Sequence, residues 1–227
     1  MVAAAAWPFR AQPPSLTPSD AVRFAVIGDN GTGDKYEYEV AQQMIAARRE
    51  FPFEMVLMLG DNIYGRQDPQ AFVEKFEEPY RPLLEAGVRF YASLGNHDNQ
   101  RNRLYPPFNM GGERYYTFAR KNVRFFVLDS DFLDPKQVTW IDEALKSSRE
   151  EWKICYFHHP LYSDGGTHGS SVACACCSSR SSSLTASTSS SRATTISTSA
   201  SRRRKGSTTS WRGPEVSCAR ATPGAPP

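Results

Sequence analysis

Six side chains in the first 160 residues are candidates for metal binding or proton transfer. They fall into four short polar clusters and are Asp29, Asp61, Tyr64, Asn96, His97 and His158. Carboxylate, amide, phenol and imidazole groups suit zinc, iron or manganese better than a soft, thiolate-bound metal. The residue types therefore predict a site for ions of this class.

A pair of such ions would allow phosphate-ester chemistry. One aspartate placed between two ions can bridge them. Ions roughly 3.5–4 Å apart can hold a phosphate ester, generate hydroxide at neutral pH and stabilise both the attacking and the leaving oxygen. His97 directly follows a candidate ligand, so it is placed to donate a proton or to stabilise charge on the phosphoryl group.

Each residue also has an ordinary structural interpretation. A Gly-Asp pair after a strand usually forms a turn or caps a helix, and an Asn-His pair usually hydrogen-bonds within a loop. His158 could be a core histidine, and Tyr64 could be a half-buried aromatic residue. The site hypothesis depends on the conjunction of the four clusters, because each of them follows a predicted strand.

The predicted strands are short apolar segments that end at the polar clusters. They are residues 22–27, 55–59, 90–94 and 154–157. Two further segments, residues 115–119 and 123–128, predict antiparallel strands joined by a tight turn.

Three helices are predicted between these strands, over residues 37–49, over residues 69–84 and after Asp134-Pro135, where proline suits a first helical turn. Each has one apolar face. It is made of Val40, Met44 and Ala47 in the first helix, of Phe72, Phe76 and Tyr80 in the second, and of Val138, Ile141 and Leu145 in the third. Strands that alternate with helices indicate an α/β sheet, which binds ligands beyond the carboxyl ends of its strands. The four clusters are therefore expected to meet at one edge.

Composition divides the chain into three parts. Residues 1–20 form a Pro/Ala-rich arm, residues 21–171 resemble an ordinary, slightly acidic domain, and residues 172–227 contain fifteen Ser, eight Thr and eight Lys/Arg with one acidic residue. Such a tail buries too little apolar surface to offset its chain entropy, so disorder is expected there.

Cysteine use argues against a zinc site in the tail, and hydropathy argues against a membrane-spanning segment. Cys155 lies in an apolar run, which favours a small buried side chain. The tail cysteines, Cys174, Cys176, Cys177 and Cys218, lack the spacing and the histidines of a zinc site. No apolar run approaches the roughly twenty residues that span a bilayer. The first residues do not form a convincing signal peptide, so the compartment is left open.

The order of the clusters resembles the calcineurin-like metallophosphoesterases. The matching motifs are Gly28-Asp29-Asn30-Gly31, Gly60-Asp61-Asn62-Ile63-Tyr64, Gly95-Asn96-His97-Asp98 and Phe157-His158-His159-Pro160. Tyr64, three residues after the second aspartate, makes the chain most similar to the purple acid phosphatase branch, especially its small tartrate-resistant type. The resemblance extends from Arg23 to about Ser171.

The resemblance implies a role for each position. Asp29 and Tyr64 would bind a ferric ion, with Tyr64 as the tyrosinate, and Asp61 would bridge to a second ion. The remaining residues are implied to act as follows: Asn96 and His158 as ligands of the second ion, His97 as the group that contacts phosphate and protonates the leaving group, and His168 as an outer histidine.

The same resemblance implies a four-layer α/β/β/α sandwich and a binuclear centre of iron with zinc, manganese or a second iron. The implied reaction is hydrolysis of a small phosphorylated substrate by metal-bound hydroxide. No membrane and no nucleic-acid partner are expected. The exception would be a genuine basic tail that binds nucleic acid through residues 202–205. Two alternatives stay open, a non-catalytic or unstable fragment and a phosphodiesterase or nucleotidase of the same superfamily.

One family motif is missing. The signature ends with Gly-His-x-His, which supplies one histidine to each metal, and no histidine follows His168 here. The chain is therefore expected to be impaired and to lack its last strands.

A displaced reading frame would account for this loss. If each codon starts one nucleotide earlier, the codons of residues 193–196, Ala-Thr-Thr-Ile, can encode Gly-His-Asp-His. The codons of residues 188–192 can then encode Asp-Val-Val-Phe-Ser, which is a strand pattern. The tail is accordingly interpreted as an out-of-frame product, with the shift between about Gly169 and Ala173.

Overall fold

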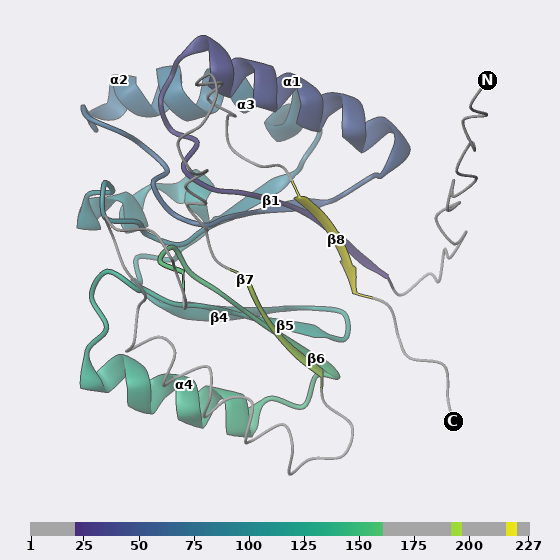
Figure 1. Ribbon diagram of the computed structural model, residues 1–227, viewed down its shortest axis with the longest axis vertical. Coiled ribbons are helices and arrows are strands. Elements are labelled where there is room, and N and C mark those ends of the chain that lie inside the picture. Colours follow the sequence, from purple (N-terminus) through teal and green to yellow (C-terminus); the bar gives the residue numbers. More distant parts are fainter. Residues whose placement is uncertain (1–20, 161–191, 197–216, 222–227) are drawn as a thin grey trace, which may run out of the picture.

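The computed structural model describes residues 21–160, 192–196 and 217–221. Two four-stranded sheets face each other, and helices cover both outer faces, which gives four layers in the order α/β/β/α (Figure 1). The predicted fold class is confirmed. His168 and most of the Ser/Thr-rich tail lie outside the described residues.

The first sheet has the strand order β3-β2-β1-β8. Strands β1 (Val22–Ile27), β2 (Met55–Met58) and β3 (Arg89–Ala92) are parallel. Strand β8 (Ser217–Ala221) pairs antiparallel with β1. The three parallel strands therefore direct their carboxyl ends, and the loops that follow, to one side of the molecule.

The second sheet has the strand order β4-β5-β6-β7. Strands β4 (Tyr116–Arg120) and β5 (Val123–Val127) form the predicted hairpin. Strands β6 (Trp152–Tyr156) and β7 (Arg192–Ile196) continue parallel to β5. The carboxyl end of β6 carries His158, so this sheet also contributes to the predicted site.

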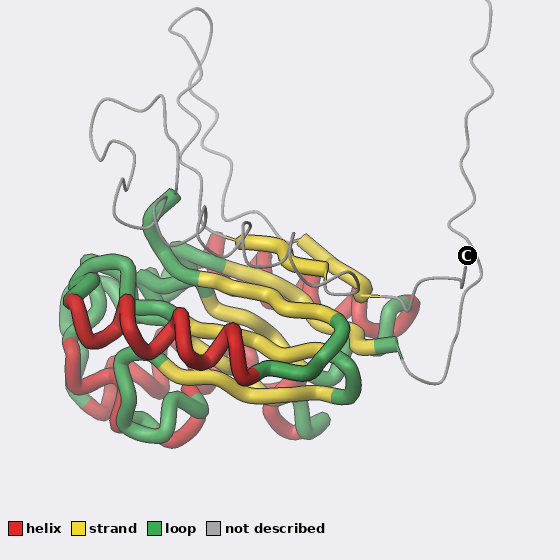
Figure 2. The backbone as a smooth tube through the Cα atoms, turned by 90° about the horizontal axis from the view of Figure 1, so that it is seen from below, coloured by secondary structure: helices red, strands yellow, loops and turns green. Residues whose placement is uncertain are grey.

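Helices α1 (Lys35–Glu50), α2 (Pro69–Phe72) and α3 (Glu78–Glu85) cover the first sheet. Helix α4 (Pro135–Ser147) lies across the outer face of the second sheet (Figure 2). Two short 3₁₀ helices, η2 (Gln100–Leu104) and η3 (Pro106–Phe108), follow the third cluster. Among the described residues no helix is both long and apolar enough to cross a bilayer.

Alternation along the strands divides the core into three apolar layers. In β1, Phe24 packs between the sheets, whereas Ala25 packs under the helices. In β5, Phe125 faces the first sheet and Phe126 faces α4. The rings of Phe24 and Phe125 meet edge to face, with centroids 5.5 Å apart. A strand buried on both faces needs apolar residues at every position, which is why these segments are continuous apolar runs.

The helix predicted over residues 69–84 is interrupted by a π-helix, η1 (Val73–Glu77). Phe72, Phe76 and Tyr80 are buried as the spacing predicts. Pro79 has no N–H to donate to the carbonyl of Lys75, so the α-helical ladder cannot continue through this point. The backbone N–H of Glu78 instead reaches the carbonyl of Val73.

The prediction that the last strands are absent is wrong. Strand β7 occupies the edge beside β6, and strand β8 occupies the edge beside β1. A sheet edge exposes unpaired N–H and C=O groups, and any extended segment can satisfy them through its backbone, whatever its side chains are. Edge pairing therefore does not require the apolar pattern on which the prediction depended.

Candidate metal centre

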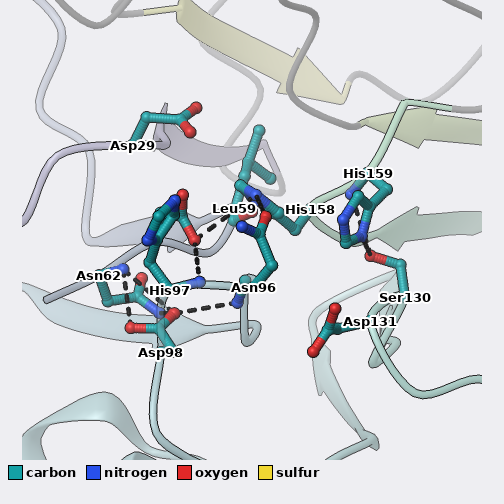
Figure 3. Close-up of polar contacts among 12 residues, drawn as sticks. Asp29, Leu59, Asn62, Asn96, His97, Asp98, Ser130, Asp131, His158 and His159 are labelled. Carbon is teal, nitrogen blue, oxygen red and sulfur yellow. Dashed lines mark hydrogen bonds and ion pairs between the residues drawn. The ribbon is translucent and has the colours of Figure 1, made fainter. Parts of the chain in front are cut away.

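The six predicted side chains lie beyond the carboxyl ends of four strands. Asp29 follows β1, Asp61 follows β2, and His158 follows β6. Asn96 and His97 follow β3, and Figure 3 shows both near His158 and Asp29. Both sheets thus contribute to one site, which is the convergence expected for loops at the carboxyl ends of parallel strands.

The two aspartates have an unusual backbone conformation. The φ angle is 56° at Asp29 and 55° at Asp61, in the left-handed region that residues other than glycine seldom adopt. Such strain persists only where surrounding contacts fix it, and it concentrates at functional sites. Here the N–H of Asp29 donates to Gly60 O at 3.1 Å, and the N–H of Gly31 donates to Asp61 O at 3.3 Å. These bonds tie the first two loops together.

His158 is oriented by a backbone carbonyl. Its Nδ1 lies 2.9 Å from Leu59 O, and because a carbonyl only accepts, Nδ1 carries a proton. Its Nε2 lies 3.1 Å from Asn96 Oδ1 and 3.5 Å from Asp61 Oδ1. A carbonyl that fixes one imidazole nitrogen and leaves the other toward carboxylates is the usual arrangement of a metal-binding histidine.

The ligand atoms converge closely enough to hold a cation. Asp29, Asp61 and His158 each offer one atom, and these atoms lie within 4.8 Å of one another. The carboxylate oxygens of Asp29 and Asp61 face one another beside His158 Nε2, so a positive charge between them would relieve the repulsion of the two carboxylates. The donor set fits a divalent or trivalent ion of the zinc, iron or manganese class.

Electrostatics at Asp29 agree with a site for positive charge. Loss of solvent around its carboxyl is the main cause that raises the pKa of Asp29, and the charge of Asp61 adds to this effect. His158 acts in the opposite direction. A carboxylate whose pKa is raised by a neighbouring carboxylate is stabilised in its charged form by a cation.

Tyr64 bridges the two aspartates. Its hydroxyl lies 2.7 Å from Asp61 Oδ2 and 3.3 Å from Asp29 Oδ1. Burial raises the pKa of Tyr64 above its ordinary value, and the hydrogen bond to Asp61 raises it further. The phenol is therefore protonated here, and it can lose that proton only where a metal ion replaces it.

His97 lies at the exposed side of the cluster. Its backbone N–H donates to Asp61 Oδ1 at 2.9 Å. Its ring packs against the ring of Tyr64, with centroids 4.9 Å apart. The side chain is exposed, so its imidazole is accessible to a molecule that enters from solvent.

The sequence motifs did not reveal the role of Asp98. Its carboxylate accepts hydrogen bonds from the backbone N–H groups of Asn62, Ile63 and Gly95, at 2.9 to 3.1 Å, and from the side chain of Asn62 at 2.7 Å (Figure 3). Burial raises the pKa of Asp98 to about 6 despite these bonds. Asp98 and Asn62 therefore lock the second and third loops together. Both residues belong to the Gly-Asp-Asn and Gly-Asn-His-Asp motifs, and this was the sequence signal that could have indicated their role.

Two further side chains fasten the same loops. Gln67 donates to His97 O at 2.6 Å and to Ile63 O at 2.8 Å. Lys75, from the π-helix, donates to Tyr64 O and, at 3.3 Å, to Arg66 O. The helical irregularity thus directs a lysine onto the loop that carries Tyr64.

Two histidines remain, His159, for which no role was predicted, and His168, which was predicted as an outer histidine. His159 pairs with Ser130 in the neighbouring loop, where Nδ1 lies 3.0 Å from the hydroxyl oxygen (Figure 3). The same hydroxyl accepts the backbone N–H of His159 at 2.9 Å. His168 lies outside the described residues, so its role stays a prediction.

Close approach of the loops explains a glycine at position 95. A Cβ atom there would lie 2.3 Å from Asp61 Oδ1 and 2.4 Å from Asp61 N, so the backbone would have to shift. Overpacking of this kind typically costs about 1–3 kcal/mol. We expect Gly95→Ala to lower the melting temperature and to displace Asp61, which thermal unfolding and metal titration would measure.

A matched control is Gly87→Ala. Gly87 has a φ of +76°, but a Cβ there meets nothing within 4 Å. This variant isolates backbone strain from steric conflict. Equal destabilisation by the two substitutions, with metal binding unchanged in both, would contradict the steric account of Gly95.

The chain is similar to known phosphoesterases. The family model described as calcineurin-like phosphoesterase matches residues 22–181. The human protein named tartrate-resistant acid phosphatase type 5 is 26% identical over 194 residues, which cover 65% of this chain and 60% of that protein. Purple acid phosphatase 3 of Arabidopsis thaliana is 29% identical over 198 residues, which cover 70% of this chain and 53% of the relative. The chain thus spans little more than half the length of these relatives.

A solved structure shares the fold. It is titled GAP50, the anchor in the inner membrane complex of Plasmodium, and it superposes with a TM-score of 0.59 at 18% identity. The superposition covers 73% of this chain and 63% of that chain. At this identity the similarity concerns the architecture alone.

Proposed function

Because this chain belongs to the calcineurin-like phosphoesterase family, we propose that its site hydrolyses small phosphate monoesters. The observation that carries the proposal is the convergence of acceptor atoms from Asp29, Asp61 and His158 within 4.8 Å of one another. The named acid phosphatases among its relatives support the monoester class. This activity is proposed in full for a form of the chain that carries the Gly-His-x-His motif.

The family implies a binuclear metal centre, and we assign its ligands as follows. Asp29 and Tyr64 would hold a ferric ion, Asp61 would be shared by both ions, and Asn96 with His158 would hold zinc, manganese or a second iron. Such ions, when bound, supply the positive charge that activates water and neutralises a phosphate ester. The hydrogen bond from His158 Nδ1 to Leu59 O supports this assignment, because it leaves Nε2 as the ligand atom.

The chain's own residues would then bind and protonate the substrate. His97, exposed beside Tyr64, contacts the phosphoryl group and gives a proton to the leaving oxygen. Its backbone N–H, held by Asp61 at 2.9 Å, fixes the position of this histidine relative to the metal ligands. Asp98 keeps the loops of Asp61 and His97 in register.

We also propose that this chain is impaired by the loss of Gly-His-x-His. The segment that a displaced frame would turn into this motif lies in β7. In that segment Ile196 O accepts the backbone N–H of Phe157 at 3.3 Å, one residue before His158. A pair of histidines at positions 194 and 196 would therefore lie on the strand beside His158, which supports the frameshift hypothesis and an out-of-frame tail.

Hydrolysis of p-nitrophenyl phosphate by the purified chain tests the proposed function. With added iron and zinc we expect slow, chelator-sensitive hydrolysis of the monoester and slower hydrolysis of bis-(p-nitrophenyl) phosphate. Preference for the diester would favour the phosphodiesterase alternative. No hydrolysis above the metal-only background, in the chain and also in its frame-restored form, would contradict the proposal.

A further inference from the structure

A buried polar cluster lies behind the loop that carries Asp29. Asn30 is 1% exposed, Glu37 is 1% exposed and Tyr80 is fully buried. Each of these side chains acts electrostatically on the others. Polar groups are seldom buried without a purpose, because burial removes their hydrogen bonds to water.

Glu37 occupies an altered capping arrangement at the start of α1. Asp34 is the N-cap residue, and its side chain accepts from the N–H groups of Tyr36 and Glu37. In a standard capping box the third helical residue would bond back to the N-cap N–H. Glu37 instead reaches one residue further, and its Oε2 accepts the N–H of Gly33 at 2.6 Å. The carboxyl thus turns inward and holds the Asp29 loop.

The buried carboxyl is a neutral anchor at neutral pH. Burial is the main cause that raises the pKa of Glu37 to about 8, and the nearby charge of Asp34 adds to it. The N–H of Gly33 and the side chains of Asn30 and Tyr80 oppose this shift. A protonated carboxyl both accepts and donates, so it can bond Gly33 with one oxygen and offer its proton to a neighbour with the other.

The loop that Glu37 holds has left-handed backbone at both ends, which strains Asp29 but not the glycine. Asp29 has a φ of 56°, and Gly33 has a φ of 72°. Between them the N–H of Thr32 closes a short turn on Asn30 O at 2.8 Å, and Gly31 pairs with the second loop, donating to Asp61 O at 3.3 Å and accepting from Tyr64 N at 2.7 Å. A left-handed residue other than glycine needs outside contacts to stay in place, and Glu37 adds one to this loop from the helix through the N–H of Gly33.

We propose that Glu37 is a positioning residue for the metal site, which holds residues 29–33 so that the Asp29 carboxylate faces Asp61 and His158. This inference rests on the proposed metal site. Glu37 contacts neither a metal ion nor substrate, and it acts through Gly33 and through Asn30, the neighbour of Asp29. The predicted consequence is that changes at Glu37 alter metal affinity without touching a ligand.

Three variants of the full chain test this role. Glu37→Gln keeps an acceptor and a donor at nearly the same shape, whereas Glu37→Ala removes both. Gln137→Ala is the matched control, because Gln137 is buried on α4 and ties a different loop through hydrogen bonds to Asp129 N and Asp129 O at 2.8 and 3.0 Å. Both alanine variants remove a buried tether, but only one tether holds Asp29.

We expect Glu37→Ala to speed amide exchange in residues 28–34 and to weaken binding of Mn²⁺ by about 10–100-fold, the range seen when groups behind a ligand are lost. Glu37→Gln should restore slow exchange and manganese affinity to near those of the unmodified chain. Gln137→Ala should speed exchange around residues 129–132 and leave manganese affinity unchanged.

A second measurement does not require the alanine variant to fold. Because the pKa of Glu37 is raised, the folded state holds its proton while the unfolded state releases it, so the unmodified chain loses stability as the pH rises from 4.5 toward 8. The melting temperature of Glu37→Gln minus that of the unmodified chain should therefore increase as the pH rises through this range.

The proposal is overturned if amide exchange in residues 28–34 is the same in Glu37→Ala as in the unmodified chain, or if Gln137→Ala weakens manganese binding equally. A constant difference in melting temperature between Glu37→Gln and the unmodified chain from pH 5 to pH 8 would also overturn it. If the unmodified chain binds no Mn²⁺ at all, the proposed function fails, and the exchange rates still decide whether Glu37 holds the loop.

Discussion

Replacing Asp61 with asparagine is expected to reduce phosphatase turnover by at least about 100-fold, because even the loss of groups behind a ligand costs about 10–100-fold. Asp61 lies at the centre of the site, where Oδ1 is 3.5 Å from His158 Nε2 and Oδ2 accepts the Tyr64 hydroxyl at 2.7 Å. An amide lacks the negative charge that holds two cations together. The measurement is turnover of p-nitrophenyl phosphate by the frame-restored protein, with metal content determined in parallel.

The matched control for this substitution is Asp142→Asn. Asp142 lies on the exposed side of α4 and pairs with Lys146 at 2.6 Å, far in sequence from any candidate ligand. This variant makes the same chemical change on the surface, and it should leave turnover unchanged. Full activity of Asp61→Asn would show that Asp61 is not a metal ligand.

Restoring the reading frame after about Gly169 is expected to raise turnover by at least about 100-fold. The reason is chemical, since each predicted ion regains one imidazole ligand, and even indirect losses at metal sites cost about 10–100-fold. Strands β7 and β8 already occupy the sheet edges, so the expected gain concerns ligands more than the fold. The measurement compares turnover and bound metal of the two proteins under identical conditions.

The control for frame restoration is the restored protein with alanine at positions 194 and 196. It keeps the restored strand but removes both imidazoles, and it should be as slow as the chain described here. If the present chain is as fast as the restored one, the frameshift account is wrong and residues of the tail supply the missing ligands.

The sequence predicted the fold because its strands are buried on both faces. Continuous apolar runs such as residues 22–27 and 123–128 have few alternatives to a central strand, and the polar residues that follow them meet at one edge. The helices were predicted less accurately on their buried faces. Met44, Ile141 and Leu145 are buried as the periodicity indicated, but Val40 and Val138 are only half-buried. Glu37 and Gln137, which it did not indicate, are buried. Apolar periodicity does not identify a polar residue that is buried to bond a loop.

The remaining differences also have physical reasons. The π-helix depends on a missing N–H at Pro79 and on packing, which no local pattern specifies. The role of Asp98 was not predicted, because it depends on hydrogen bonds to three backbone N–H groups that only the folded loops bring together. The strands of the tail pair through their backbone at the sheet edges, which any extended segment can do, so side-chain composition did not predict them.

The measurement that tests the metal site most directly is nitrogen NMR of His158 during a Zn²⁺ titration. Metal content alone is less specific, since it does not identify the residues that hold the ion. The account predicts that zinc shifts the Nε2 resonance of His158 while Nδ1 stays protonated on Leu59 O, and that Asp61→Asn abolishes the shift. Zinc binding that leaves both nitrogens of His158 unchanged would contradict the assignment of Asp29, Asp61 and His158 as a metal centre.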